Sequence, residues 1–517
     1  MSKLLASINN LKGLLFLFSL GIVFAGNTLA GVNLNNGNFF ISYYDFIIKS
    51  EDKAKEELKI SRTYNSKSVD IGWFGFGWGS DFETYLEVIP GGFLIHEYGA
   101  GSKNWFYKDN MQKKDIEYYV DKIIERIKLN NKNSTNGIPE NLKEKLINDA
   151  ELRYSYWKKY KANITLENEP VKFKPGDELH NVQYENANKL IVTESGYTRY
   201  QNGIEQDKFD KNGRLVRQHL GDDLYATLSY SGDGSRIEIH TNDGRKLLIH
   251  FKEFDNNKFV TKITSPALEK ESNYKYSGKN LIESIDAGGN DFKYKYDINH
   301  NVIQVGYADN TTLDVEYREK DYFVNKLTYR DKSYRTFEYY NYPDRPDFHY
   351  STLTKLYDPK NLLSELTFTE FYTEKNKAGN HQIRRLIKST NSIGDANNEL
   401  IDVSFNNCCG LPVKIRYGKN DLMVEYAQDP AIANQIKAIK SDKIEIKIDY
   451  NQAGKPVKVM DDDGATIAVE YDESGNINKL KESQDTDATR AKEIKEYFLK
   501  YYQIIKLVTG CECMRSI

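Results

Sequence analysis

Residues 276–317 read YSGKNLIESIDAGGNDFKYKYDINHNVIQVGYADNTTLDVEY, and this stretch decides the fold. Short runs of alternating polar and apolar residues end at Tyr276, Tyr296 and Tyr317, and turn residues such as Gly288-Gly289 separate them. Glycine, Asp and Asn readily adopt the positive backbone angles that tight hairpins require. The stretch therefore predicts short antiparallel strands joined by tight turns.

The same unit recurs along most of the chain. Repeat ends fall at Tyr230, Phe251, Tyr276, Tyr296, Tyr317 and Tyr339, and then at Tyr426, Tyr450 and Tyr471. Neighbouring ends within each set are 20 to 25 residues apart, which is room for about two strands and two turns. One hairpin cannot bury its apolar face alone, so the units must pair side by side. We expect a mainly β fold, with an extended antiparallel sheet over residues 166–482.

Strict alternation supports this reading. In 236–240 (RIEIH) and 443–448 (KIEIKI), apolar and charged residues alternate over the whole run. Such a period of two places the apolar side chains on one face of a strand and the charges on the other. The 38 Tyr and 24 Phe residues fit a sheet with one wet face, because a Tyr ring packs while its hydroxyl stays hydrated.

Two regions show helical periodicity instead. Residues 110–165 predict an inserted helical hairpin: Asp115 caps a helix whose apolar stripe runs from Ile116 to Ile127, and Pro139 starts a second helix. The stripe of the second helix is Leu142, Leu146, Ala150, Tyr154 and Trp157. The tail, 483–517, predicts a third helix over about 489–508 followed by a Cys-x-Cys motif.

The first thirty residues have the order of a secretory signal. Lys3 and Lys12 precede an apolar run over 13–25, and small residues lead to an expected cleavage site after Ala30. The alternative, a transmembrane anchor, is disfavoured because a run of about 13 residues is short for a bilayer that needs roughly 20. We expect an exported protein that is periplasmic, at the cell surface or secreted, without a transmembrane anchor.

Charge disfavours one class of partner. Lys plus Arg number 72 and Asp plus Glu number 75, for a formal net charge of -3, and the basic residues are scattered along the chain. Nucleic acid binding normally requires a basic patch or arm. We therefore expect no nucleic-acid partner.

The four cysteines leave several states open. They are Cys408, Cys409, Cys511 and Cys513. In an oxidising compartment they can form one or two disulfide bridges, whose pairing cannot be deduced, or they can stay free. No His lies close to either pair in sequence, so a metal site is the less favoured alternative.

Two motifs resemble a known family. The first series is Ser61, Arg62, Thr63, Tyr64, Asn65 and Ser66, followed by Gly75, Gly77 and Trp78, within residues 31–109. It resembles the N-terminal segment of Rhs-type proteins. The second motif is Tyr471-Asp472-Glu473-Ser474-Gly475-Asn476-Ile477, with a close variant that begins at Tyr296-Asp297. It resembles the YD repeat of the same proteins.

The Rhs/YD-repeat resemblance implies a sheet curled into a shell, which often encases a C-terminal toxic domain. Here about 35 residues follow the last repeat, and the usual Asp-Pro-x-Gly-Leu boundary has no match before them. The resemblance therefore favours a partial shell that encloses or presents a separately encoded partner polypeptide, such as a toxin. The alternative is a surface module that binds polysaccharide or cells. Trp73, Trp78 and Trp105 are expected to plug one end of the sheet.

Motifs for catalysis are weak. Asp461-Asp462-Asp463-Gly464 with Glu470 imitates half of a calcium loop, but Val459 occupies the first ligand position, so we interpret the segment as a hairpin turn. The eight histidines form no His-x-x-x-His pair, and no Gly-x-Ser-x-Gly elbow or phosphate loop is present in the sequence. We expect no catalytic, metal or cofactor residues, although a hydrolase built from distant residues stays an open alternative.

Overall fold

The computed structural model covers most of the chain. It describes residues 23–25, 28–49, 57–99, 101–109, 111–130, 139–182, 188–201, 203–221, 224–254, 256–376, 381–393, 398–406, 410–418, 420–429, 432, 435–442, 444–451, 455–471 and 477–482. The C-terminal helix predicted over 489–508, all four cysteines, and Asp472 and Gly475 of the last repeat lie outside the described residues.

The N-terminal strands form a small antiparallel sheet with the order β1-β2-β3-β4-β7. Its strands are β1 (Val23–Ala25), β2 (Thr28–Asn33), β3 (Asn38–Ile48), β4 (Leu58–Asn65) and β7 (Trp78–Ser80). A short hairpin of β5 (Ile71–Gly72) and β6 (Gly75–Phe76) precedes β7. We call the described residues from 28 to 80 the plug.

Strands β8 to β37 form one long antiparallel sheet in which each strand pairs with the next along the chain. The first half comprises β8 (Tyr85–Ile89), β9 (Gly92–His96), β10 (Lys103–Tyr107), β11 (Glu178–Asn181), β12 (Asn188–Val192), β13 (Gly196–Gln201), β14 (Ile204–Asp210), β15 (Leu215–Gly221), β16 (Leu224–Tyr230), β17 (Arg236–Thr241), β18 (Lys246–Phe254), β19 (Asn257–Ser265), β20 (Lys270–Ser277), β21 (Asn280–Ile285) and β22 (Asp291–Tyr296). The second half comprises β23 (Val302–Tyr307), β24 (Thr312–Tyr317), β25 (Val324–Thr328), β26 (Tyr334–Asn341), β27 (His349–Tyr357), β28 (Leu363–Lys375), β29 (His381–Ser392), β30 (Asn398–Phe405), β31 (Pro412–Tyr417), β32 (Asn420–Tyr426), β33 (Ile436–Ser441), β34 (Glu445–Tyr450), β35 (Pro456–Asp461), β36 (Thr466–Tyr471) and β37 (Ile477–Glu482).

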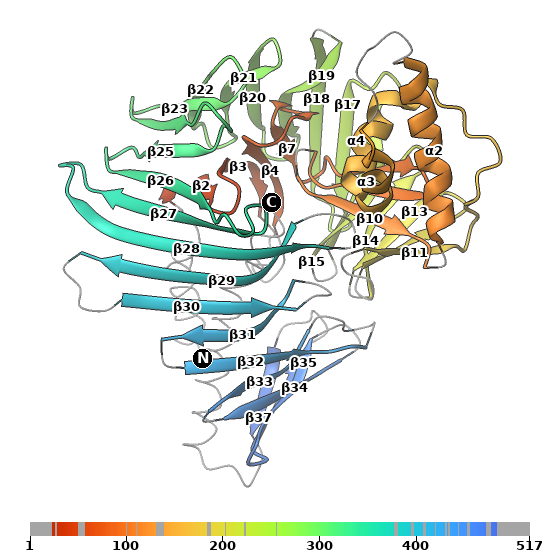
Figure 1. Cartoon of the computed structure of the whole chain (residues 1–517). Coiled ribbons are helices and arrows are strands. Elements are labelled where there is room, and N and C mark those ends of the chain that lie inside the picture. Colours follow the sequence, from red (N-terminus) through yellow and green to blue (C-terminus); the bar gives the residue numbers. More distant parts are fainter. Residues whose placement is uncertain are drawn as a thin grey trace.

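The long sheet curls around the plug, so that β2, β3, β4 and β7 lie within its curve (Figure 1). At its beginning the sheet folds back on itself: the Leu86 backbone N–H donates to the carbonyl of Gly213 at 2.8 Å, beside a bridge between Tyr85 and Arg214. The predicted fold class, mainly β with one extended antiparallel sheet, is confirmed.

Alternation along the strands gives the sheet an inner apolar face and an outer polar face. The main core joins plug residues such as Phe39 and Trp78 to inner-face residues of the long sheet such as Val305 and Leu327. A second apolar cluster, around Ile415 and Ile446, belongs to strands β30 to β36. The plug is therefore the filling of the first, larger part of the sheet.

The helical insertion is confirmed between β10 and β11, with one difference. It consists of α2 (Lys113–Asn130), α3 (Leu142–Asn148), α4 (Ala150–Tyr160) and the 3-10 turn η1 (Lys161–Asn163). The single second helix expected after Pro139 is broken at Asp149, whose backbone is extended and whose side chain accepts from the Leu152 N–H. An aspartate that caps a new helix in this way ends the preceding one.

The repeat period also fails in one place. Strands β27 to β29 contain 9, 13 and 12 residues, against six to eight in most of the repeats. This longer block fills the gap between the two sets of repeat ends, Tyr339 and Tyr426.

Candidate functional site

The plug is bound to the inner face through its backbone as well as its side chains. The Phe76 N–H donates to the carbonyl of Lys279 at 2.9 Å, and the carbonyl of Trp73 accepts from the Val260 N–H at 2.8 Å. At the other end, the carbonyl of Gly37 accepts from the Val324 N–H at 3.0 Å. Because these bonds satisfy buried backbone groups, the plug is a fixed part of the inner wall.

Arg62 is the centre of the plug. Its side chain is fully buried, its Nε lies 2.6 Å from Asp45 Oδ2, and its Nη2 donates to Ser284 Oγ at 2.6 Å. Asp45 Oδ2 also accepts from the Tyr274 hydroxyl at 2.8 Å. A buried charge is tolerated only when it is paired and hydrogen-bonded, and the long sheet supplies part of that pairing.

Aromatic rings enclose the Arg62 guanidinium. Its central carbon lies 4.3 Å from the ring centre of Tyr43, 4.8 Å from that of Trp78 and 5.5 Å from that of Tyr294. Guanidinium groups are attracted to the faces of such rings, more strongly when water is excluded. Trp78 in turn donates from Nε1 to the Tyr296 hydroxyl at 3.0 Å, so that it joins the plug to a repeat.

The remaining residues of the first motif position the plug strands. Ser61 donates from Oγ to Asp81 at 2.6 Å, the hydroxyls of Thr63 and Ser42 are 2.7 Å apart, and the Tyr64 hydroxyl donates to the carbonyl of His300 at 3.1 Å. Asn65 and Ser66 complete the set through bonds to Asn38 and to the Phe39 N–H.

The two glycines of this motif are required by geometry. Gly77 has φ +76°, and a Cβ there would lie 2.8 Å from the Tyr64 ring. Gly75 has φ +104°, and a Cβ there would lie 2.6 Å from the carbonyl oxygen of Lys279. Both positions combine a left-handed backbone with close approach, so that larger side chains are excluded.

The repeat-end tyrosines form a regular hydrogen-bond ladder on the inner face. Each hydroxyl donates to a backbone carbonyl 14 to 16 residues earlier. The pairs are Tyr230 to Leu215 at 2.7 Å, Tyr276 to Val260 at 2.6 Å, Tyr296 to Leu281 at 2.7 Å, Tyr317 to Val302 at 3.0 Å, Tyr339 to Val324 at 2.8 Å, Tyr426 to Pro412 at 2.8 Å, Tyr450 to Ile436 at 2.7 Å and Tyr471 to Pro456 at 2.7 Å.

The acceptors of this ladder follow a rule. Tyr296 faces Val302 at a register shift between β22 and β23, and the carbonyl of Val302 then accepts from the next repeat-end residue, Tyr317. Likewise Tyr317 faces Val324 at a shift, and Val324 accepts from Tyr339. Such bulges are recurrent local designs, and here each one is tied to the following repeat.

Loss of one hydrogen bond of this ladder is expected to lower the stability of the fold measurably. Tyr317→Phe keeps the ring but leaves the buried carbonyl of Val302 without its hydroxyl donor, and we expect the free energy of unfolding to fall by about 1–2 kcal/mol. Tyr340→Phe is the matched control, because that ring is 48% exposed. Urea unfolding followed by circular dichroism measures both; equal, near-zero effects would contradict a role for the ladder.

The aspartate of the second motif caps a turn. Asp297 Oδ1 accepts from the N–H groups of Asn299 and Asn301, each at 2.8 Å. Asp286, in the preceding turn, and Asp358, in the turn between β27 and β28, accept the same two backbone contacts. The Tyr-Asp pair thus joins one residue that binds the inner wall to one that closes a hairpin.

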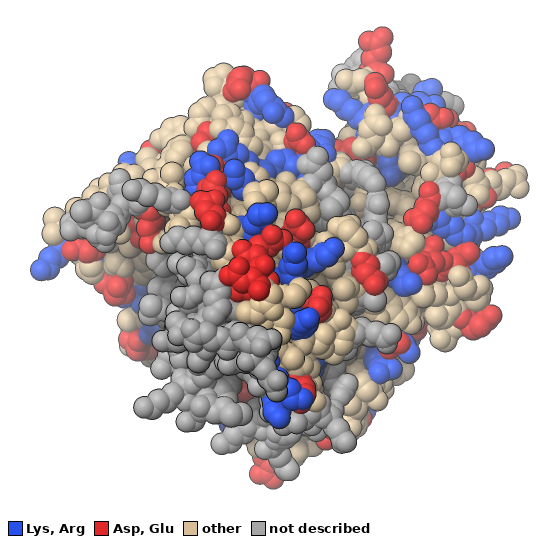
Figure 2. Space-filling view, turned by 90° about the horizontal axis from the view of Figure 1, so that it is seen from below, with Lys and Arg blue, Asp and Glu red and all other residues tan. Residues whose placement is uncertain are grey.

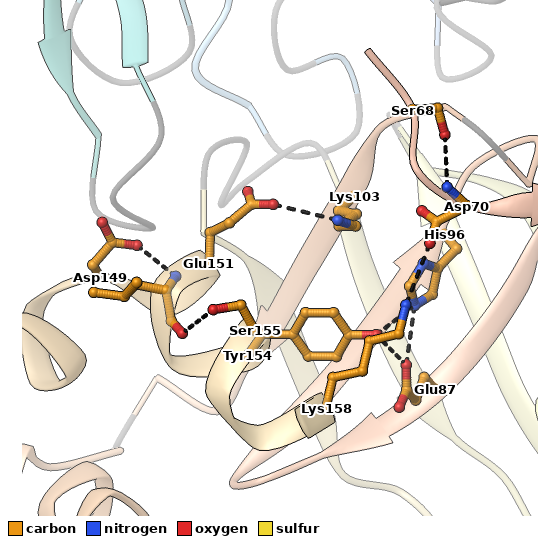
Figure 3. Close-up of polar contacts among 11 residues, drawn as sticks. Ser68, Asp70, Glu87, His96, Lys103, Asp149, Glu151, Tyr154, Ser155 and Lys158 are labelled. Carbon is orange, nitrogen blue, oxygen red and sulfur yellow. Dashed lines mark hydrogen bonds and ion pairs between the residues drawn. The ribbon is translucent and has the colours of Figure 1, made fainter. Parts of the chain in front are cut away.

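The helical insertion docks against the opposite, outer face of the first strands (Figure 3). The Tyr154 hydroxyl of α4 donates to Glu87 Oε2 of β8 at 2.6 Å, and Lys161 Nζ donates to Glu87 Oε1 at 2.7 Å. His96 Nε2 of β9 lies 3.1 Å from the same Glu87 Oε2, and the Tyr85 ring stacks on the imidazole with centres 4.3 Å apart. We call these five residues the seam cluster.

Apolar contacts complete this docking surface. Trp105 of β10 meets the Tyr154 ring edge-on at 5.5 Å, within a small cluster that includes Ile89, Leu94 and Ala150. The helices also have a core of their own around Ile123 and Leu146. Trp105, which we expected to plug the sheet, therefore faces the helical insertion, whereas Trp73 and Trp78 belong to the plug core.

The seam cluster predicts a loss of stability in acid. Although burial opposes it, hydrogen bonds from His96, Lys161 and Tyr154 lower the pKa of Glu87 to about 2. A carboxyl group whose pKa is lowered stabilises the fold above its ordinary value of 4.5, and this contribution disappears as pH falls through about 2. We expect Glu87→Gln to cost about 1–2 kcal/mol at pH 7 and little near pH 2.

Urea unfolding at pH 7, 4 and 2.5 checks this prediction for the seam cluster. Glu151→Gln is the control, since Glu151 is 47% exposed and pairs with Lys103 at 3.3 Å, and ion pairs that solvent reaches contribute little. A Glu87→Gln cost that stays constant from pH 7 to pH 2.5 would contradict the assignment.

Tyr154 of the seam cluster stays protonated near neutral pH. Burial and the bond to Glu87 raise the pKa of Tyr154, so its phenol does not ionise to a nucleophile near neutral pH. The cluster holds no serine or cysteine, and its hydrogen bonds join the helical insertion to the sheet. Elsewhere His240 is paired with Glu238 on the surface, and His250 bonds Thr264.

The acidic string Asp461-Asp462-Asp463 lies at a turn between two strands. Asp461, Asp462 and Asp463 bring carboxylates close together, the one such grouping of three found among the described residues. They lie at the β35–β36 turn, where Asp461 accepts from the Ala465 N–H at 2.8 Å. This is the hairpin turn expected from the sequence.

Surface charge is mixed. On the part of the face seen from below that is not grey, Lys and Arg are interspersed with Asp and Glu (Figure 2), so that neither sign of charge dominates there. Among the described residues, no helix has the length and apolar character to cross a membrane.

Fold and site together define a structural class: a long antiparallel β-sheet, built from recurring hairpins, whose N-terminal segment fills its inner face. Residues 30–102 match the family described as a domain of unknown function, DUF6531, which covers the plug and the first strands of the long sheet. No curated protein matches this chain.

Three solved structures show distant likeness. A TcdB2-TccC3-Cdc42 complex has 9% identity and a TM-score of 0.33, with 85% of this chain and 24% of that chain covered. The Tc holotoxin pore of Photorhabdus luminescens has 9% identity and a TM-score of 0.23, with 90% and 24% covered. A porin-like protein of Bacteroides uniformis has 11% identity and a TM-score of 0.18, with 43% and 90% covered. This chain thus spans about a quarter of the toxin chains, and the fold assignment depends on its own strand pairings.

Proposed function

We propose that this protein is an exported, non-enzymatic scaffold of the Rhs/YD-repeat type that encloses or presents a partner polypeptide. One observation carries the proposal: the inner face already holds a polypeptide, the plug, by backbone bonds, buried ion pairs and packed rings. A wall that binds its own segment in this way has the chemistry to bind another. The match to DUF6531 over residues 30–102 agrees with the resemblance seen in the motifs.

The inner face continues beyond the plug as a polar row. Thr352 Oγ1 donates to the plug carbonyl of Leu34 at 2.7 Å, and cross-strand pairing leads from Thr352 through Thr369 and Lys388 to Ile401. Ile401 packs on the second apolar cluster. Hydroxyls, a cation and an apolar end along one row suit an extended polypeptide, which offers carbonyls and side chains at regular intervals.

A paired cross-linking experiment tests the proposal. A photo-crosslinking amino acid replaces Lys388 on the inner face or, as control, Arg385 on the outer face, where it pairs with Asp402. In the full chain, expressed in its natural host, the inner position is expected to attach to a second polypeptide and the outer position is not. Equal labelling at both positions, or labelling by neither, would refute enclosure.

The surface-binding alternative has its own test. The repeat-end tyrosines face inward, so a sugar-binding surface would have to use exposed rings such as Tyr322 and Tyr340. Glycan arrays and cell-wall binding assays that are positive in the full chain and lost in Tyr340→Ala would favour that alternative. Activity screens with candidate His and Asp residues changed to alanine test the hydrolase alternative.

The mass of the exported protein tests the expected cleavage of a signal peptide. Cleavage after Ala30 would remove β1 and the first residues of β2, while the pairs Gly31–Phe40, Val32–Phe39 and Asn33–Asn38 would still hold the rest of β2 against β3. We expect the mass of the exported protein to place its first residue at Gly31. An uncleaved chain found in the exported fraction would contradict the signal peptide.

A further inference from the structure

Several buried acidic side chains lie near the point where the chain passes from the plug to the first strand of the long sheet. Glu97, just after β9, and Asp207 of β14 both pair with Nη1 of Arg199, at 2.6 and 3.2 Å. The exposed fractions of these three side chains are 10%, 2% and 5%. Glu83 lies nearby in the chain, between β7 and β8. We call Glu83, Glu97, Arg199 and Asp207 the exit cluster.

Glu83 has no cation to pair with among the described residues. Its Oε1 accepts from the Trp73 N–H of the plug at 2.7 Å, while its buried Oε2 has no hydrogen-bond partner. A Cβ on Gly99 would lie 2.5 Å from the Glu83 carboxyl carbon, so the group is packed directly against the loop after β9. The ionisable groups that face it are the phenols of Tyr85 and Tyr276.

The carboxyl group of Asp207 is buried among charged and polar side chains. Arg199 of β13 forms an ion pair with Asp207. The side-chain amide nitrogen of Gln218 on β15 lies 3.5 Å from Asp207 Oδ1 and 3.5 Å from the carbonyl oxygen of Asp81. Glu97 supplies a second negative charge, and Tyr98 lies beside both carboxylates, Asp81 and Arg199. One guanidinium thus serves two carboxylates at this point, and Glu83 is left without any.

Protonation of the carboxyl groups removes this excess of buried negative charge. An ionised carboxyl buried without a cation is strongly unfavourable, and the usual outcome is that the group stays protonated. Burial raises the pKa of Glu83 well above its ordinary range. Burial also raises the pKa of Asp207 to about 6, against the opposing attraction of Arg199.

We propose that the exit cluster is a proton-dependent latch, in which protonated Glu83 and Asp207 hold the plug against the long sheet and their ionisation loosens that junction. Glu83 accepts from the Trp73 N–H of the plug, and Gln218 lies between Asp207 and the carbonyl of Asp81 at the end of the plug, so both acids stand at this junction. Their ionisation would place two further negative charges there, which one arginine, Arg199, already paired with Glu97, does not neutralise. A cation is the less suitable counter-charge, since the carboxylates of the cluster do not converge on one point as those of Asp461 to Asp463 do.

The direction of the pH dependence follows from the coupling of proton binding to folding. A carboxyl group whose pKa is raised on folding binds more protons in the folded state, so its contribution is complete below its ordinary value of 3.8 and is lost as pH rises through about 6. The junction is therefore tighter at pH 5 than at pH 8. This direction is opposite to that of the seam cluster, which weakens in acid.

Hydrogen exchange of the full chain provides the first test. After correction for intrinsic exchange rates, amides of β4 and β7 in the plug are expected to lose roughly tenfold or more in protection between pH 5 and pH 8, since each pKa unit is a factor of ten. Amides of β33 to β36, remote from the cluster in sequence and in a separate apolar cluster, serve as the internal control. Equal loss in both regions, or none in the plug, would overturn the proposal.

Substitution provides the second test. Glu83→Gln and Asp207→Asn imitate the protonated side chains, and Asp207→Asn leaves Arg199 paired one-to-one with Glu97. The double variant is expected to keep its plug protection at pH 8 and to lose most of the pH dependence. Asp309→Asn, at an exposed turn, is the control and should change neither. A double variant that is less protected than the natural chain at pH 8 would show that the ionised groups are needed, and would overturn the latch.

Discussion

Replacement of Arg62 by leucine is expected to lower the free energy of unfolding by about 3–5 kcal/mol, because it leaves Asp45 buried without its cation. Arg62 also donates to Ser284 of the long sheet, 222 positions further along the chain. Its loss should therefore weaken the attachment of the plug as well as the plug itself. Urea unfolding, followed by circular dichroism and by tryptophan fluorescence, measures the change.

Two variants make this result specific. Arg62→Leu combined with Asp45→Asn removes the uncompensated charge and should recover part of the loss. Arg385→Leu breaks an ion pair with Asp402 in which Arg385 is 46% exposed, and should cost less than about 1 kcal/mol. If Arg62→Leu and Arg385→Leu were equally mild, Arg62 would not be the centre of the plug.

Trp78→Ala is expected to have an effect of similar size, about 3–5 kcal/mol. The side chain is fully buried, and its ring contacts Tyr64 at 5.3 Å and Tyr294 at 5.2 Å between centres. Alanine would leave a cavity between the plug and the repeats and remove the donor to Tyr296. The unfolding measurements used for Arg62 apply unchanged.

Trp78→Phe separates the two contributions. It keeps most of the ring volume and loses the hydrogen bond, so its cost should be about 1–2 kcal/mol. Tyr322→Ala, at a ring that is 42% exposed, should cost less still. A Trp78→Ala effect no larger than that of Tyr322→Ala would show that the plug does not depend on this contact.

Several features were predictable from local pattern alone. The Tyr-ended repeats predicted the antiparallel strands from β16 to β26 and from β31 to β36, and the stripe from Ile116 to Ile127 predicted α2. The motif residues Arg62, Tyr64 and Trp78 were identified by resemblance, and the structure brings them together in one buried cluster.

Other features left no local signal. Nothing near Glu87 in sequence indicates that it bonds Tyr154 and Lys161, which lie 67 and 74 positions away. The break at Asp149 was missed because a helical period of apolar residues continues through it, while the capping contact that ends α3 is a single side-chain bond. The exit cluster was missed because its acids are isolated in sequence and become a group only after folding.

The sequence by itself determined the kind of sheet, because alternation and turn residues act over a few neighbouring positions and set strand, face and hairpin directly. The tertiary structure alone decided what fills the sheet, which charges share a partner and where the helices dock. Those outcomes depend on burial, and burial brings together residues that are far apart in sequence, as Arg62 and Ser284 are, 222 positions from each other.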